Sequence, residues 1–226
     1  MYAGITLYRN SGKITGVHQK IDRIARFQLN KYIPKSVRFP SIDEILHFEG
    51  NNGPDAIRIK DSSKDVPRYV VTPTDLSDRE VLDELHNFIV NLSKALKNHN
   101  NERAAFEAAW MGHAIGDSLS PAHHNPMNGT FKHVMFEAGM VLFIAPSKFK
   151  ITCLNDKDIN QLQQKGFEAI FLESLHKIHT SKIYQEFSEK GWTINLISKT
   201  KKMLIPEIAK VLALAWYQTI ILAQKS

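Results

Sequence analysis

Apolar residues recur every three or four positions through most of this 226-residue chain. This spacing is typical of helices that bury one face against a core, because residues three or four apart share a helix face. The chain has no internal repeat and no shift in composition that would mark a domain boundary. The sequence therefore predicts a single all-α domain over residues 1–226, built from segments 17–33, 77–98, 101–119, 132–144, 158–179 and a last helix after Pro206.

Local signals place several helix ends. Ser77 and Glu80 stand in the register of a capping box at the start of segment 77–98. An asparagine opens segment 101–119 and can cap it. Pro206 suits the first turn of the last helix, where its missing N–H costs nothing.

Composition and charge exclude several classes of protein. The net charge of +6 is spread along the chain, and no nucleic-acid-binding motif is present, so we expect anionic or phosphate-bearing partners but no stable nucleic-acid complex. Cys153 is the only cysteine, which rules out an intrachain disulfide and a thiolate-rich metal site.

The first residues lack the apolar core of a secretory signal. The apolar stretch between Lys210 and Lys225 is too short to span a bilayer comfortably. We expect a buried terminal helix, no transmembrane segment and a cytoplasmic protein.

The segment "MGHAIGDSLSPAHHNP" concentrates metal-ligating residue types at a helix end. His113 and Asp117 are four residues apart, so they share a helix face. Pro121 ends that helix, because the residue before a proline avoids the helical region. The following turn lets His123 reach back towards Asp117. His124 is an adjacent alternative, but the spacing favours His123.

A second pair lies on the next predicted helix, where His133 and Glu137 are again four residues apart. Imidazole nitrogen and carboxylate oxygen are the ligands that zinc takes, and catalytic sites leave one position open for water. A single pair of this kind often does no more than stabilise its helix. The combined pattern H-x3-D-x5-H followed by H-x3-E instead indicates a metal site.

The stretch "GHAIGDSLSPAHHNPMNGTFKHVMFE" resembles the central metal-binding segment of the zinc-dependent phospholipase C family, which is related to the fungal zinc single-strand nucleases. The resemblance implies a helical bundle of that type with a zinc cluster. In this chain it implies that His113 and Asp117 bind the paired zinc ions, with Asp117 as the bridging carboxylate. It implies that His123, His133 and Glu137 bind the remaining zinc.

Two upstream segments extend the resemblance. "SGKITGVHQKIDRIARFQL" is similar to the family's first helix, which opens with a zinc-binding histidine, and His18 is the matching position. The family also takes an aspartate and then a histidine from the next region, where "SIDEILHFEGNNGPD" offers His47 and either Asp43 or Asp55. The secreted phospholipases hold one zinc through an N-terminal tryptophan, whereas this chain begins with methionine and tyrosine. The resemblance therefore implies two or three Zn²⁺ ions.

The function that the resemblance implies is zinc-dependent hydrolysis of a phosphodiester, with a metal-bound water as the nucleophile. Asp43 or Asp55 would accept the proton from that water. A lipid headgroup, a nucleotide or a small phosphodiester remains open as the substrate. A nuclease of the same fold and a non-catalytic helical zinc-binding scaffold or interaction protein are the alternatives, since one fold hosts many activities.

The other histidines and the tryptophans carry no such pattern. We expect Trp110 to pack beneath the site, and Trp192 and Trp216 to belong to the core or its rim. The remaining histidines are expected to be structural or exposed, namely His86, His99, His176 and His179.

Overall fold

Helices form every regular element in the computed structural model, which describes residues 16–49, 52–54, 57, 60, 69–73, 79–124, 130–143 and 151–225. No strand occurs in these ranges, so the predicted all-α fold is confirmed. Three short turns link α-helices: η1 (Asn30–Tyr32), η2 (Pro121–His123) and the π-helical η4 (Thr200–Leu204). The α-helices are α1 (Val17–Leu29), α2 (Ile42–Glu49), α4 (Glu80–Lys97), α5 (Asn101–Leu119), α6 (Thr130–Phe143), α7 (Asp156–Lys165), α8 (Phe167–Thr180), α9 (Ile183–Lys190), α10 (Ile194–Lys199) and α11 (Ile205–Lys225).

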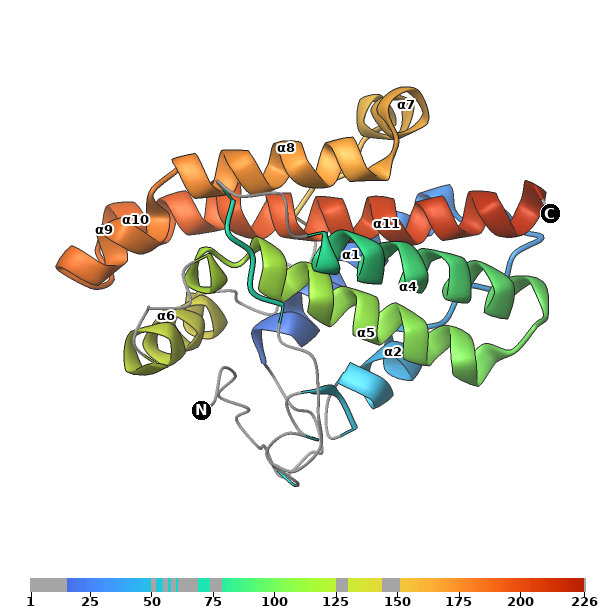
Figure 1. Cartoon of the computed structure of the whole chain (residues 1–226), viewed down its shortest axis with the longest axis horizontal. Coiled ribbons are helices and arrows are strands. Elements are labelled where there is room, and N and C mark those ends of the chain that lie inside the picture. The colour runs from blue at the N-terminus through green and yellow to red at the C-terminus, as the bar shows by residue number, and fades with distance from the viewer. Residues whose placement is uncertain are drawn as a thin grey trace.

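Helix α11 is the centre of the bundle. It packs against α1, α4, α5 and α8, and Figure 1 shows α8 running alongside it on one side with α4 and α5 on the other. Trp216 is completely buried, and its indole N–H donates to the carbonyl of Ala108 at 3.2 Å. The continuous helix from Ile194 to Lys225 is long and apolar enough to cross a membrane, yet 72% of its most apolar window is buried inside the protein. The prediction of a buried terminal helix is confirmed.

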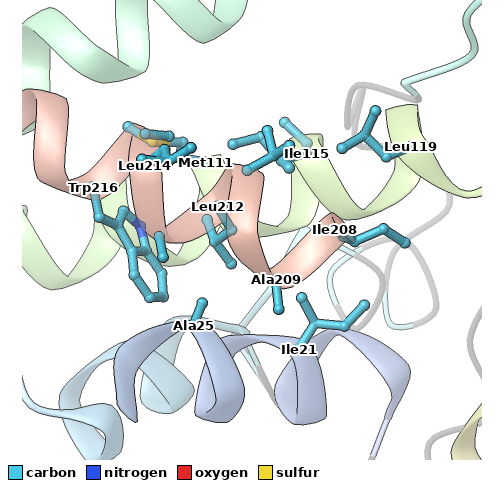
Figure 2. Packing of buried hydrophobic residues seen from close by; sticks show 14 of the residues in the cluster. Ile21, Ala25, Met111, Ile115, Leu119, Ile208, Ala209, Leu212, Leu214 and Trp216 are labelled. Carbon is cyan, nitrogen blue, oxygen red and sulfur yellow. The ribbon is translucent and has the colours of Figure 1, made fainter. Parts of the chain in front are cut away.

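The core also fixes α1 against α5, the two helices that carry the first predicted ligands. Apolar side chains from α1, α5 and α11 meet between these helices (Figure 2). Close-packed interiors have low compressibility, so this packing holds the helices in fixed relative positions. The participating side chains are at most 2% exposed and include Ile21 and Ala25 from α1, Met111, Ile115 and Leu119 from α5, and Ile208 and Leu212 from α11.

Several helix boundaries differ from the predicted ones. Segment 158–179 is divided between α7 and α8 at Gly166, whose φ of 79° breaks the helix and suits a residue without a Cβ. Pro206 is the second residue of α11 and lies in its first turn, as predicted, although the chain is already helical from Ile194 through α10 and η4. The π-helical turn η4 ends at Leu204, two residues before this proline, which lacks the N–H that an α-helix would use. Helix α4 begins at Glu80, and Ser77 lies outside the described residues.

Candidate metal centre

The first group of candidate ligands joins α1 to α5. His18, His113 and Asp117 each offer an atom within 4.8 Å of the others, and all three are buried. His18 Nε2 lies 3.3 Å from Asp117 Oδ1, and His113 Nε2 lies 3.4 Å from Asp117 Oδ2. The predicted convergence of His18 on the downstream pair is therefore present in the structure.

Two glycines on α5 let α1 come close enough to make this group. A Cβ on Gly116 would lie 2.4 Å from His18 Nδ1, and one on Gly112 would lie 2.6 Å from Asp22 Oδ1. Both distances are far shorter than real Cβ contacts. The side chains of His18 and Asp22 thus occupy the space that larger residues on α5 would fill.

Replacing Gly116 with alanine is expected to weaken the group. An alanine in a helix usually stabilises it by about 1 kcal/mol relative to glycine. Here we expect the reverse, a loss of about 1–3 kcal/mol, because the added methyl overpacks against the ring of His18. Urea unfolding of the metal-free protein measures the change, and a gain in stability would contradict the close approach of α1 to α5.

The second group lies at the end of α5 and on α6. His123, His133 and Glu137 also offer ligand atoms within 4.8 Å of one another. Glu137 Oε1 is 3.0 Å from His133 Nε2 and 3.4 Å from His123 Nε2. Pro121 is the first residue of η2, so the chain turns out of α5 and carries His123 back towards that helix, as predicted.

Asp117 links the two groups. Its Oδ1 atom lies 3.4 Å from His123 Nε2 in the second group and 3.3 Å from His18 Nε2 in the first. The carboxylate is 3% exposed. It is therefore placed as a carboxylate that bridges neighbouring ions would be.

Burial and mutual attraction shift the pKa values of these residues in opposite directions. Burial and His113 lower the pKa of His18, but the hydrogen bond and charge of Asp117, with Glu49, outweigh them and raise it to about 9. Burial acts to raise the pKa of Glu137, but hydrogen bonds with His123 and His133 lower it to about 2. Burial opposes ionisation of Asp117 as well, yet His123 and His113 hold its pKa well below the ordinary value. The carboxylates of Glu137 and Asp117 are thus charged near neutral pH.

The donor set fits zinc. It consists of imidazole nitrogens and carboxylate oxygens, which zinc binds at about 2 Å. In the described part of the chain, the Nδ1 atom of His18 and the Oε2 atom of Glu137 have no hydrogen-bond partner although they are buried. Buried polar atoms normally have a hydrogen-bond partner. Unpartnered atoms in these two neighbouring groups therefore indicate a site where an ion could bind them.

The structure does not bring His47 and Asp43 to either group. Both are exposed, and His47 contacts Asn52 instead. On α2 the buried positions are Ile45 and Glu49, four residues apart, so Asp43 and His47 fall on the outer face of the helix. The expectation that these two residues are zinc ligands, and that Asp43 accepts a proton, is not met. Asp55 lies outside the described residues.

Two buried carboxylates at the first group were missed from the sequence. Glu49 is 4% exposed, and its Oε1 accepts a hydrogen bond from His113 Nδ1 at 3.1 Å. A carboxylate at Nδ1 fixes the tautomer of a histidine and directs the Nε2 lone pair to a metal. Asp22 is completely buried and lies four residues after His18 on α1. The H-x3-D pattern of His113 and Asp117 is thus repeated at His18, a signal that could have found Asp22.

A cavity of about 550 Å³ opens beside the second group, between η2 and the corner where α8 meets α9. Tyr184 lies in its wall and packs against Phe136 at 5.2 Å between ring centroids. Burial and the charge of Glu137 raise the pKa of Tyr184. His124 lines the cavity rather than joining the metal groups, and its Nε2 donates to the carbonyl of Ser118 at 3.0 Å. No acidic side chain occurs in the lining, which consists of Pro121, His124, His179, Thr180, Lys182, Ile183, Tyr184, Gln185 and Ser188.

The structure also places the tryptophans and the remaining histidines. Trp216 belongs to the core, and Trp192 stacks on Phe136 at its rim. Trp110 is partly buried and packs against Phe106 at 4.9 Å. The other histidines are exposed, namely His86, His99, His176 and His179.

Comparison with known proteins assigns no family. No family model matches the chain, and no curated protein matches it significantly. The geometry of the two groups therefore carries the functional argument.

Proposed function

We propose that this protein is a zinc-dependent phosphodiester hydrolase. The observation that carries the proposal is the position of Asp117, whose carboxylate lies within 3.4 Å of histidines from both candidate groups. A buried carboxylate between two sets of zinc-type donors is the arrangement expected where neighbouring cations share a ligand. A helical core of this size needs no such cluster for its stability.

The chain's own residues would hold and orient the ions. His18, His113 and Asp117 would bind at the first group, and His123, His133 and Glu137 at the second. Zinc ions held there would supply a water of lowered pKa and positive charge to offset that of the phosphoryl oxygens.

The cavity beside the second group supports a substrate larger than inorganic phosphate. Its volume of about 550 Å³ falls in the range of ligand pockets, roughly 300–1,000 Å³. Its lining offers hydroxyl groups, an amide and the ammonium of Lys182, with no carboxylate to repel a phosphodiester. We propose that one ester substituent of the substrate occupies this cavity.

Hydrolysis of an activated phosphodiester tests the proposal. The purified full chain, loaded with zinc, is expected to hydrolyse bis(p-nitrophenyl) phosphate at a slow to moderate rate. A chelator should abolish the activity, and added zinc should restore it. If zinc binds but no phosphodiester or phosphomonoester in a broad panel is hydrolysed, the non-catalytic scaffold is the better interpretation.

Replacing Lys182 with glutamine tests the role of the cavity. The side chain keeps a similar length, while the ammonium group in the cavity lining is lost. A hydrogen bond to a charged group is worth about 1.5–3 kcal/mol, so we expect KM to rise about tenfold or more with little change in kcat. Lys190→Gln, at an exposed position on α9, is the control. Equal KM values for Lys182→Gln and the parent would place the substrate elsewhere.

A further inference from the structure

Asp22 is a buried carboxylate that the fold does not explain. It has no exposed surface, and neither of its oxygens has a hydrogen-bond partner in the part of the chain that the structure describes. An unpaired buried charge costs several kcal/mol, and native proteins normally pair it or coordinate it to a metal. Apolar residues of similar size would fill this position without that cost.

The surroundings of Asp22 are those of the first group. It lies four residues after His18 on α1, and its Oδ1 fills the space over Gly112, the residue before His113. The charges that act on its carboxyl group come from Glu49, His18 and His113, with a smaller contribution from Arg23. Asp22 therefore lies on the same helix faces as the residues that already form the group.

The charge balance of the first group is compatible with two cations. Burial and Glu49 raise the pKa of Asp22 in the metal-free protein, so its carboxylate forms readily only where a cation offsets its charge. Asp22, Glu49 and Asp117 together carry three negative charges when ionised, and all three are buried. Histidines that bind a metal do so as neutral imidazoles. One divalent cation would leave a net charge of about −1 in the interior, whereas two would reverse its sign and let Asp117 be shared.

We propose that Asp22 is a metal ligand, and that with it the first group holds two divalent cations rather than one. His18, Asp22, His113 and Asp117 would supply the donors, and Glu49 would act as a positioning residue that orients His113 through Nδ1. This inference rests on the metal site of the proposed function but not on its chemistry.

The test counts zinc ions bound by the purified full chain after chelator treatment and titration with Zn²⁺ alone. Isothermal titration and elemental analysis give the number and affinity of the ions. Asp22→Asn is expected to lose one ion per chain, or to bind it about 100-fold more weakly. Glu207→Gln is the matched control, because Glu207 is also buried but is paired with Ser174, Lys177 and Lys210. It should keep every ion.

Stability separates a ligand from a purely structural residue. In chelator, Asp22→Asn is expected to be as stable as the parent or more so, because it removes an unpaired buried carboxyl group. In zinc it should be less stable than the parent. Asp22→Ala is the second variant, since it leaves no amide to satisfy. An unchanged zinc count, or a loss of stability that is equal in chelator and in zinc, would overturn the proposal. If Asp22→Asn loses one zinc ion as expected but the zinc-loaded parent hydrolyses no phosphodiester, only the proposed activity is refuted.

Discussion

Replacing Asp117 with asparagine is expected to have the largest effect of any single polar substitution in this chain. Its carboxylate oxygens lie 3.3–3.4 Å from the Nε2 atoms of His18, His113 and His123. An amide offers one weak acceptor where the carboxylate offers two charged oxygens, so it cannot bind two ions. We expect zinc affinity to fall by about 100-fold or more and hydrolysis to become undetectable.

The overall fold should survive this substitution. Asn has nearly the same volume as Asp, and a single polar change rarely unfolds a domain of this size. Circular dichroism is therefore expected to show nearly unchanged helix content. Asp83→Asn, an exposed position on α4, is the control and should keep full activity. Equal activity of Asp117→Asn and the parent would show that the turnover comes from another site.

The second large effect concerns stability and pH. As the pH rises, we expect the metal-free protein to become less stable and the zinc-dependent stabilisation to increase. The pKa of His18 is raised from about 6.5 to about 9 in the folded protein. Its stabilising contribution is therefore fully present below pH 6.5 and is lost as the pH rises through 9. The gap corresponds to on the order of 3 kcal/mol. We expect the metal-free protein to lose stability over this range.

Zinc should reverse this slope. The ion needs the neutral imidazole, so protons compete with it below pH 9 and the zinc-dependent stabilisation grows as the pH rises. Urea unfolding at pH 6.5, 7.5 and 8.5, in chelator and in zinc, measures both slopes. His18→Gln should flatten the slope in chelator, and the exposed His86→Gln should not. Parallel slopes in chelator and zinc would contradict the assignment of His18 as a ligand.

Acid should affect the second group. The pKa of Glu137 is lowered from about 4.5 to about 2, because its hydrogen bonds with His123 and His133 outweigh burial. Its contribution is thus present above pH 4.5 and is lost as the pH falls through 2. His18 and Glu137 therefore contribute most to the stability of the metal-free protein between about pH 4.5 and 6.5.

Helix periodicity predicted the part of the site that lies on long, regular helices. His113 and Asp117 share a face of α5, and His133 and Glu137 share a face of α6, because residues four apart stack on one side. Pro121 marked the turn that returns His123 to them. In these segments the local pattern and the tertiary arrangement agree.

The upstream ligands were harder to predict, because the sequence of a short helix does not indicate which of its faces is buried. In α2 the pair Ile45 and Glu49 faces the core, while the pair Asp43 and His47 has the same spacing but faces solvent. Only the packing of α2 against α5 and α1 decides between them. Asp22 was overlooked because an aspartate in an amphipathic helix is usually solvated, and its burial follows from the close approach at Gly112.

The most direct test of the account is a count of the metal ions and their ligands in crystals of the zinc-loaded protein. Anomalous scattering recorded on both sides of the zinc absorption edge locates each ion. We predict a zinc peak at His123, His133 and Glu137, and two more at the first group, with Asp117 and Asp22 among the ligands. A well-ordered, zinc-saturated crystal without a peak at either group, or with the His123, His133 and Glu137 side chains more than about 6 Å apart when zinc bonds are near 2 Å, would contradict it.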